Sequence, residues 1–234
     1  MKGFPNADLR RWRLLMEIIE MKDIAIYGDG GYGREIACML TRIVNSGSDW
    51  RFVGFFDDDN SLKGSSNAYG KVLGDMDVLN AWPTPISLVI AIGSPDGIKK
   101  VVDRVANNIV DFPNLIDPTV TFLDPESFAM GKGNIIGCNC FVSCNVEIGD
   151  FNIFNGYIPV GHDVRIGDFN VVMPSCNISG GVEMGNANFL GVQSIVLQNV
   201  KIGNNTRIGA GSVVIRNTKD GYLYMGNPAR KIEL

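Results

Sequence analysis

Apolar residues recur at every sixth position through the C-terminal half of the chain. Counting in sixes from Met130 to Val214, all fifteen positions are apolar, whereas only 45% of the whole chain is hydrophobic. A random sequence of that composition would give such a run well under about one time in a thousand. Glycine follows nine of the fifteen positions, which indicates a tight turn after many of them.

A second series lies two residues before the first and repeats every eighteen residues. Its three rows are Asn134, Asn152, Asn170, Asn188 and Thr206; Val146, Val164, Val182 and Val200; and Cys140, Ile158, Cys176, Ser194 and Ser212. A six-residue repeat that closes after three steps describes a triangular coil of short strands, stacked about 4.8 Å apart. The pattern predicts a parallel β-helix of the hexapeptide kind. An ordinary β-sandwich is the alternative, but its period of two does not produce a period of six.

The N-terminal half changes to a strand, a glycine loop and a helix. We expect strands over 24–27, 52–56 and 86–92, and a helix over 34–44. The loop between the first strand and this helix has the spacing G-x-G-x-x-G, with glycines at 28, 30 and 33. Asp57 and Asp58 follow the second strand, and Gly93 follows the third. The pattern predicts a Rossmann-like α/β domain.

The glycine loop is a candidate phosphate site, because it directs backbone amides and a helix N-terminus at one point. A carboxylate after the second strand could contact a ribose or a base edge. A tight turn with nothing bound is the alternative reading of the loop alone. An NAD site is less persuasive, since only about three βα units are present rather than two complete halves.

Composition and charge narrow the range of partners. The net charge of −4 argues against nucleic acid as a main partner, and no cluster of basic residues contradicts this. No apolar run has the roughly 18 residues that a membrane span needs, and no signal peptide opens the chain. Five cysteines without a paired framework are typical of a reducing cytoplasm. Cys138, Cys140 and Cys144 lack a standard zinc spacing, so we expect no metal.

Four segments follow from these patterns. Residues 1–20 form an N-terminal extension, in which a basic amphipathic stretch predicts a terminal helix or, alternatively, a helix lying on a membrane surface. Residues 21–110 form the Rossmann-like domain, and residues 111–129 are a connection rich in Pro and Asp. Residues 130–234 form the β-helix with its C-terminal tail.

His162 is the one histidine of the chain, and its register places it outside the coil. It belongs to neither inward series, and Asp163 follows it. An exposed imidazole next to a carboxylate can act as a general base. Gly180 lies eighteen residues on, where the absence of a side chain leaves room and a backbone N–H that could polarise a carbonyl. A surface histidine on a corner turn is the alternative.

The sequence resembles the bacterial acetyltransferases that modify nucleotide-linked amino sugars, whose near relatives include sialic acid O-acetyltransferases. The motifs that carry the resemblance are GDGGYGRE at 28–35, FFDDD at 55–59, AIG at 91–93, GHDVRIGDF at 161–169 and GNPARK at 226–231. It implies a left-handed β-helix, although parallel crossovers in general are right-handed. It also implies a homotrimer and acetyl-CoA as the acyl donor.

The resemblance also assigns roles to residues of this chain. His162 matches the base, Asp163 the acid that orients it, and Gly180 the amide that holds the thioester oxygen. Acetyl-CoA would further contact Val192, Ala210, Pro228 and Arg230. The nucleotide-sugar site would comprise Gly30, Gly31, Tyr32, Gly33, Asp57, Asp58, Gly93 and Asn155.

Two departures from the family limit what can be carried over about the acceptor. Tyr32 stands where the glycine loop usually has a histidine, and Val171 replaces a second histidine seen in some relatives. The expected reaction is acetyl transfer to the amine of a nucleotide-linked amino sugar. O-acetylation of a sialic acid-like or other hydroxyl, and a non-catalytic scaffold with a regulatory nucleotide pocket, are the alternatives. The outward residues Phe151, Phe169 and Phe189 are expected to be covered by a neighbouring subunit.

Overall fold

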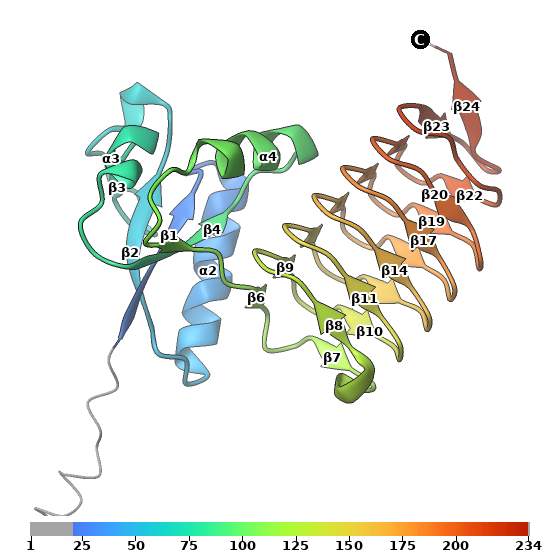
Figure 1. The fold of residues 1–234 in the computed structure, drawn as a ribbon, viewed down its shortest axis with the longest axis horizontal. Coiled ribbons are helices and arrows are strands. Elements are labelled where there is room, and N and C mark those ends of the chain that lie inside the picture. Colours follow the sequence, from blue (N-terminus) through green and yellow to red (C-terminus); the bar gives the residue numbers. More distant parts are fainter. Residues whose placement is uncertain (1–20, 234) are drawn as a thin grey trace, which may run out of the picture.

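The computed structural model describes residues 21–233, as an α/β unit followed by a long β-helix (Figure 1). The helix expected near the N-terminus lies in residues 1–20, outside the described part. Within residues 21–233, no helix has the length and apolar character needed to cross a membrane.

The α/β unit is built on a five-stranded parallel sheet with the order β3-β2-β1-β4-β5. The fully buried strand β4 and the mostly buried β1 occupy its centre, as apolar runs do in parallel sheets. The strands are β1 (Lys22–Tyr27), β2 (Trp50–Phe56), β3 (Val72–Gly74), β4 (Ile86–Ile90) and β5 (Val110–Asp111); the helices are η1 (Asn60–Leu62), α2 (Gly31–Asn45), α3 (Met76–Asn80) and α4 (Pro95–Arg104). The predicted Rossmann-like fold is confirmed.

The glycine loop brings helix α2 tightly against the end of β1. A Cβ on Gly33 would lie 1.9 Å from the carbonyl oxygen of Gly28, and Gly28 has a φ of +107°. Both positions therefore require glycine for steric reasons that do not depend on a ligand.

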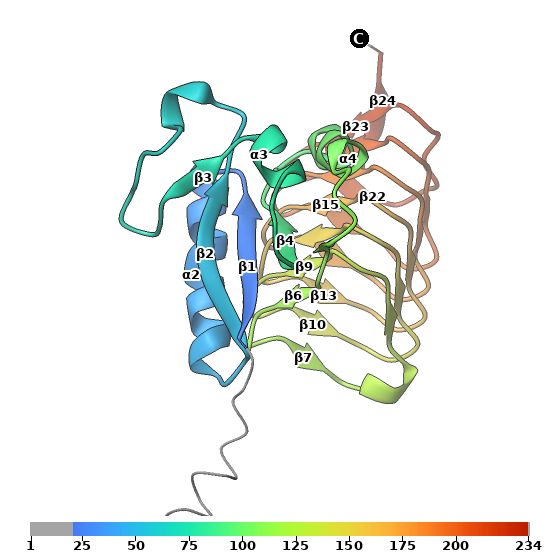
Figure 2. The same ribbon diagram turned by 60° about the vertical axis from the view of Figure 1, so that its left-hand side comes forward.

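The β-helix has three faces, which we call first, second and third in the order in which the chain visits them (Figure 2). The first face contains β6 (Leu115–Ile116), β9 (Ile135–Ile136), β12 (Ile153–Phe154), β15 (Val171–Val172), β18 (Phe189–Leu190), β21 (Arg207–Ile208), β23 (Leu223–Met225) and β24 (Arg230–Ile232). The second contains β7 (Thr121–Phe122), β10 (Phe141–Val142), β13 (Pro159–Val160), β16 (Asn177–Ile178), β19 (Ile195–Val196) and β22 (Val213–Val214). The third contains β8 (Ala129–Met130), β11 (Glu147–Ile148), β14 (Arg165–Ile166), β17 (Glu183–Met184) and β20 (Lys201–Ile202).

The interior follows the predicted period. Every position of the six-residue series except Met130 is buried. The buried asparagine row forms a ladder in which side-chain amides donate to the asparagine of the preceding coil, as in the 3.0 Å bond from Nδ2 of Asn152 to Oδ1 of Asn134. The ladder satisfies polar groups that would otherwise be costly to bury. The coils are left-handed, as the family resemblance implied.

The β-helix starts earlier than residue 130. Strands β6, β7 and β8 already pair with the next coil, so most of the segment 111–129 forms the first coil rather than a free connection. The 3-10 helix η2 (Pro125–Ser127) lies within this coil. We propose that the boundary between the two units falls at residues 112–114.

The α/β unit packs against the N-terminal coils of the first face. Phe151 is only 4% exposed, lies edge-on to Phe112 at 5.1 Å and stacks on Phe169 at 5.4 Å. Phe189 packs against the same core. The expectation that a neighbouring subunit covers these rings is therefore wrong for Phe151, which the α/β unit of the same chain buries, whereas Phe169 and Phe189 are half-buried in the single chain. An ion pair between Arg42 and the buried Asp117 also joins the two units.

Candidate active site

His162 and Asp163 lie at the corner between the second and third faces, which we call the second corner (residues 143–146, 161–164 and 179–182). Nδ1 of His162 is 2.7 Å from Oδ2 of Asp163, and both side chains are more than half exposed. Asp163 has a φ of +56°, a left-handed conformation that Asp adopts more readily than most residues. The hydrogen bond from His162 holds the pKa of Asp163 below its usual value, so this acid stays ionised near neutrality.

Gly180 lies directly beside the imidazole, one coil further on. It is buried, and a Cβ placed on it would come 2.6 Å from Nε2 of His162. In the part of the chain that the structure describes, the N–H of Gly180 donates to no backbone carbonyl. The second corner thus combines a base, a carboxylate that orients it and an unused N–H donor, which is the set that an acyl transfer requires.

The remaining positions assigned to acetyl-CoA lie along the corner between the first and second faces, which we call the first corner (residues 155–158, 173–176, 191–194 and 209–212). Val192 and Ala210 are exposed there, and their N–H groups donate to no backbone carbonyl among residues 21–233. Pro228 and Arg230 are exposed in the tail that crosses the last coil, where Ala229 N–H donates to the Val213 carbonyl at 2.8 Å. A row of unused amide donors fits the amide-rich arm of coenzyme A.

Four of the residues assigned to the nucleotide sugar line one cavity between the α/β unit and the first face. This cavity of about 340 Å³ is lined by Gly31, Tyr32, Gly93 and Asn155, together with Glu35, Ile153, Val171, Met173 and Phe189. Sequence reasoning missed Glu35, Ile153, Met173 and Phe189 as site residues. The eighteen-residue spacing of Ile153, Val171 and Phe189 could have indicated a shared outer face.

The N-terminus of α2 opens at this cavity. Gly30 caps the helix without a side-chain hydrogen bond, which leaves the first amides available to an anion such as a phosphate. The hydroxyl of Tyr32 is buried and has no partner within residues 21–233. Burial also raises the pKa of Tyr32, so this hydroxyl remains a proton donor. The first amides of α2 therefore offer donors to a phosphorylated ligand in this cavity.

The two acids after β2 already have partners within the chain. Asp57 accepts the N–H of Asp29 at 2.7 Å and that of Asp59 at 2.9 Å, which fixes the glycine loop against the end of β2. Asp58 pairs with Arg104 through both of its oxygens, and this contact lowers the pKa of Asp58. These acids border the loop, but they do not line the cavity of about 340 Å³.

A second cavity, of about 280 Å³, continues from the first around Tyr32, Glu35 and Asn155. It reaches Cys38, Cys138 and the ion pair of Arg42 with Asp117. No cluster of three or more His, Cys, Asp or Glu side chains suited to a metal occurs between residues 21 and 233. Cys140 is buried as a core residue, and burial raises the pKa of its thiol to about 11.

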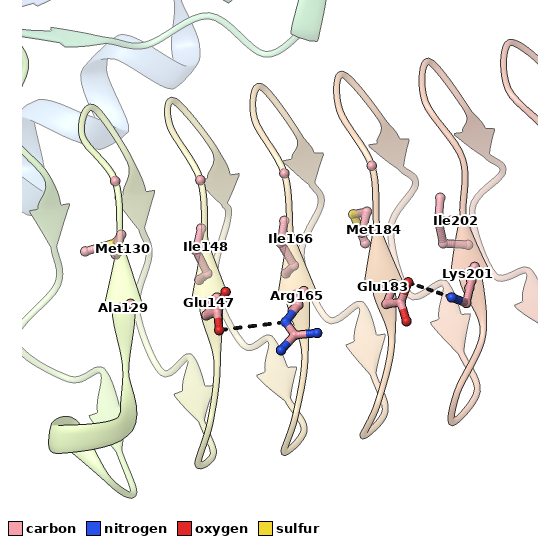
Figure 3. A pocket seen from close by; sticks show the side chains of 14 residues that line it. Ala129, Met130, Glu147, Ile148, Arg165, Ile166, Glu183, Met184, Lys201 and Ile202 are labelled. Carbon is pink, nitrogen blue, oxygen red and sulfur yellow. Dashed lines mark hydrogen bonds and ion pairs between the residues drawn. The ribbon is translucent and has the colours of Figure 1, made fainter.

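A groove of about 770 Å³ runs along the third face and contains none of the assigned site residues (Figure 3). Its outward charges pair between coils, Arg165 with Glu147 at 3.7 Å and Lys201 with Glu183 at 2.8 Å. Because the pairs neutralise each other, the groove offers no net charge to a charged ligand.

Two family models match separate parts of the chain. Residues 23–105 match the PglD N-terminal domain, and residues 181–216 match the bacterial transferase hexapeptide (six repeats). A curated relative, UDP-N-acetylbacillosamine N-acetyltransferase of Bacillus subtilis, is 29% identical over 117 residues. The match covers 50% of this chain, which spans about half the length (51%) of that relative.

Two solved structures resemble nearly the whole chain. A histidine variant of perosamine N-acetyltransferase from Caulobacter crescentus, with CoA and GDP-perosamine bound, has a TM-score of 0.79 at 26% identity and covers 90% of this chain and 97% of its own. The acetyltransferase domain of PglB from Neisseria gonorrhoeae, with acetyl coenzyme A, has a TM-score of 0.81 at 26% identity and covers 91% of this chain and 100% of its own.

Proposed function

We propose that this chain, whose two units both resemble the hexapeptide-repeat sugar acetyltransferases, transfers acetyl from acetyl-CoA to the amine of a nucleotide-linked amino sugar. One observation carries the proposal: His162, paired with Asp163, lies against the side-chain-free Gly180 and its unused N–H. Two of the relatives named above, the bacillosamine and perosamine enzymes, are N-acetyltransferases, which favours an amine over a hydroxyl as the acceptor.

The reaction follows from these groups. The amine attacks the thioester carbonyl while Nε2 of His162 accepts its proton, and Asp163 stabilises the resulting imidazolium. The N–H of Gly180 donates to the oxyanion of the tetrahedral intermediate. Collapse of the intermediate forms the amide and breaks the C–S bond. The imidazolium then returns the proton to the thiolate, which leaves as the free thiol of CoA.

In one chain the proposed parts of this site are separated. His162 and Gly180 lie at the second corner, whereas Asn155, Val192 and the nucleotide cavity lie at the first corner, across the second face. Three prisms whose second faces turn toward a common axis would bring the second corner of each copy beside the first corner of the next. A homotrimer would therefore complete three sites, each between two subunits.

The character of the faces favours this arrangement. The α/β unit covers part of the first face, and paired charges cover the third. On the second face the outward strand positions are mostly apolar: Phe141, Pro159, Ile195 and Val213. Phe141 is 38% exposed in a single chain. An apolar face of this kind is typical of a subunit contact.

We expect light scattering at micromolar concentration to give the mass of three chains for the natural protein. Phe141→Asp should shift that mass toward one chain, because the contact would bury an unpaired carboxylate three times around the axis. Glu147→Gln on the third face should leave the assembly unchanged. A stable monomer of the natural chain would contradict both the trimer and the shared site.

A second prediction tests the nucleotide cavity. No atom lies within 4 Å of a Cβ placed on Gly31, so Gly31→Val should fold normally and fill the space at the start of α2. We expect KM for the nucleotide sugar to rise at least about tenfold, while the affinity for acetyl-CoA stays nearly unchanged. Initial rates with each substrate varied in turn measure both values. If both affinities fell together, the assignment of the nucleotide sugar to the α/β unit and of acetyl-CoA to the β-helix would be wrong.

We place the reaction in the cytoplasm. All five cysteines are free thiols, which fits a reducing compartment and a supply of acetyl-CoA. Mass spectrometry of products formed from a panel of nucleotide amino sugars would identify the acceptor. An acetyl group recovered on a hydroxyl would favour the O-acetyltransferase alternative instead.

A further inference from the structure

A hydrogen-bonded row of three side chains runs along the second corner and ends at His162. Asn145 lies one coil before Asp163, and its Nδ2 donates a 3.1 Å hydrogen bond to Oδ1 of Asp163. The other oxygen of that carboxylate lies 2.7 Å from Nδ1 of His162. We propose that Asn145 is a positioning residue, which holds the Asp163 carboxylate so that His162 keeps one orientation and one tautomer. The proposal rests on the proposed function, although part of its test does not.

The opposite corner shows what a purely structural acid does in this fold. At the corner between the third and first faces, a row of side-chain oxygens accepts backbone N–H groups from the preceding coil. Examples are Lys132 N–H to Asp150 at 2.9 Å and Asp150 N–H to Asp168 at 2.8 Å. Asp163 instead accepts from two side chains and, within residues 21–233, from no backbone N–H. Its carboxylate therefore connects side chains rather than coils.

Asn145 itself is well anchored. Its backbone N–H donates to Oγ of Ser127 at 2.9 Å, and its φ of +54° suits an asparagine at a corner turn. The conformation alone would explain an asparagine here, since glycine or asparagine tolerates a positive φ. The hydrogen bond to Asp163 uses the side-chain amide of Asn145 and does not depend on the positive φ. A test therefore has to remove the side-chain amide and keep the backbone conformation.

The chemical consequence concerns the proton on the imidazole. An ionised carboxylate only accepts, so the contact with Asp163 places the proton of neutral His162 on Nδ1 and leaves the lone pair of Nε2 facing Gly180. Both side chains of the pair are exposed, so an unanchored carboxylate could rotate away into water. The Asn145 amide opposes that rotation.

The other charges near the pair are few. Arg165 faces Asp163 and, like the two hydrogen bonds, lowers its pKa. Glu147 faces Arg165 at 3.7 Å, and both line a polar pocket with Asp163 and Asn145. Cys144 lies on the coil before His162, and its carbonyl accepts the N–H of Asp163 at 3.0 Å. None of these groups replaces the donor that Asn145 supplies.

The chain offers a direct measurement, because His162 is its one histidine. We would label histidine with ¹⁵N in the full chain, with no added histidine tag. The ring nitrogen shifts would be recorded about two pH units above the reference value of about 6.5 for histidine in model peptides, so that the ring is neutral. The natural protein should show the Nδ1–H tautomer. Asn145→Gly, which keeps the positive φ, should show a mixture of tautomers and a kcat reduced about three- to tenfold with little change in KM.

The control is Asn205→Gly. Asn205 is also an exposed corner asparagine, with a φ of +51°, and its side chain makes no hydrogen bond to any residue from 21 to 233. Its tautomer and kcat should match those of the natural chain. If Asn145→Gly matched them as well, or if both variants changed alike, Asn145 would have no positioning role.

Asn145→Asp provides a second test that keeps the shape of the side chain. It replaces the donor by a carboxylate facing Asp163, so we expect a similar loss of kcat and a raised pKa of His162. The acid limb of the rate profile should then move to higher pH. An unchanged profile would overturn the proposal. The tautomer measurement needs no substrate, so a change in tautomer without any acetyl transfer would reject the proposed function and keep the positioning role.

Discussion

His162→Ala should lower kcat by at least about two orders of magnitude while the fold, the trimer and acetyl-CoA binding persist. The amine must lose a proton as it attacks the thioester, and removal of a general base typically costs about 10²–10⁴-fold in rate. The side chain is 53% exposed and packs in no core, so its removal leaves the coil intact. Steady-state kinetics with isothermal titration of acetyl-CoA separates the two effects.

The pH profile tests the same assignment. The hydrogen bond with His162 lowers the pKa of Asp163, so this acid is ionised throughout the neutral range. Because only the neutral imidazole accepts a proton, kcat/KM should fall when the solution is acidic enough to protonate His162 and should level off at higher pH. That limb should disappear in His162→Ala, and Asp163→Asn should reduce kcat less than His162→Ala does. If His162→Ala kept more than half of the natural turnover, the assignment of His162 as the general base would be wrong.

The β-helix could be predicted from the sequence because its interior is periodic. Ile136, Val160 and Ile202 follow one rule over the whole length, and each is buried as expected. The first coil was missed because its apolar positions leave the period: Ile116 and Phe122 are six apart, but Met130 comes eight after Phe122. The 3-10 helix η2 takes up the two extra residues.

The outer surface could not be predicted in the same way. Phe151 and Phe169 are outward in register, and the sequence pattern alone does not say whether the same chain or another covers them. The packing of the α/β unit on the first face decides this, and it depends on contacts such as Phe112 with Phe151 that join distant segments. For the same reason Ile153 and Phe189 were not recognised as lining the cavity of about 340 Å³.

The pair of His162 and Asp163 could be identified from the sequence as a candidate site, whereas its contact with Asn145 could not. His162 is the one histidine, and its register placed it outside the coil. A polar side chain at a corner can bind either another side chain or a backbone N–H of a neighbouring coil, and the sequence does not say which. Aspartates also occur at the corner between the third and first faces, where Asp150 and Asp168 accept backbone N–H groups instead.

Gly180→Ala is the other change from which we expect a large loss, about 10²-fold in kcat. The added methyl group would lie 2.6 Å from Nε2 and 2.7 Å from Cε1 of His162, far inside van der Waals contact. The backbone of Gly180 needs no positive φ, so the coil can accept alanine and the exposed ring is what must move. The N–H of residue 180 is retained, so the loss would report displacement of the base.

Gly185→Ala is a matched control, because its methyl would come 2.5 Å from a side-chain oxygen of Asn204 at the opposite corner. It should lower the melting temperature at least as much as Gly180→Ala does, yet leave kcat near the natural value. The double variant His162→Ala with Gly180→Ala then decides how Gly180 acts. If Gly180→Ala works by moving the imidazole, it should add almost nothing once His162 is gone, since residues that act through one group are not additive. Losses that multiplied would instead assign to Gly180 a role independent of the imidazole, in binding the thioester oxygen.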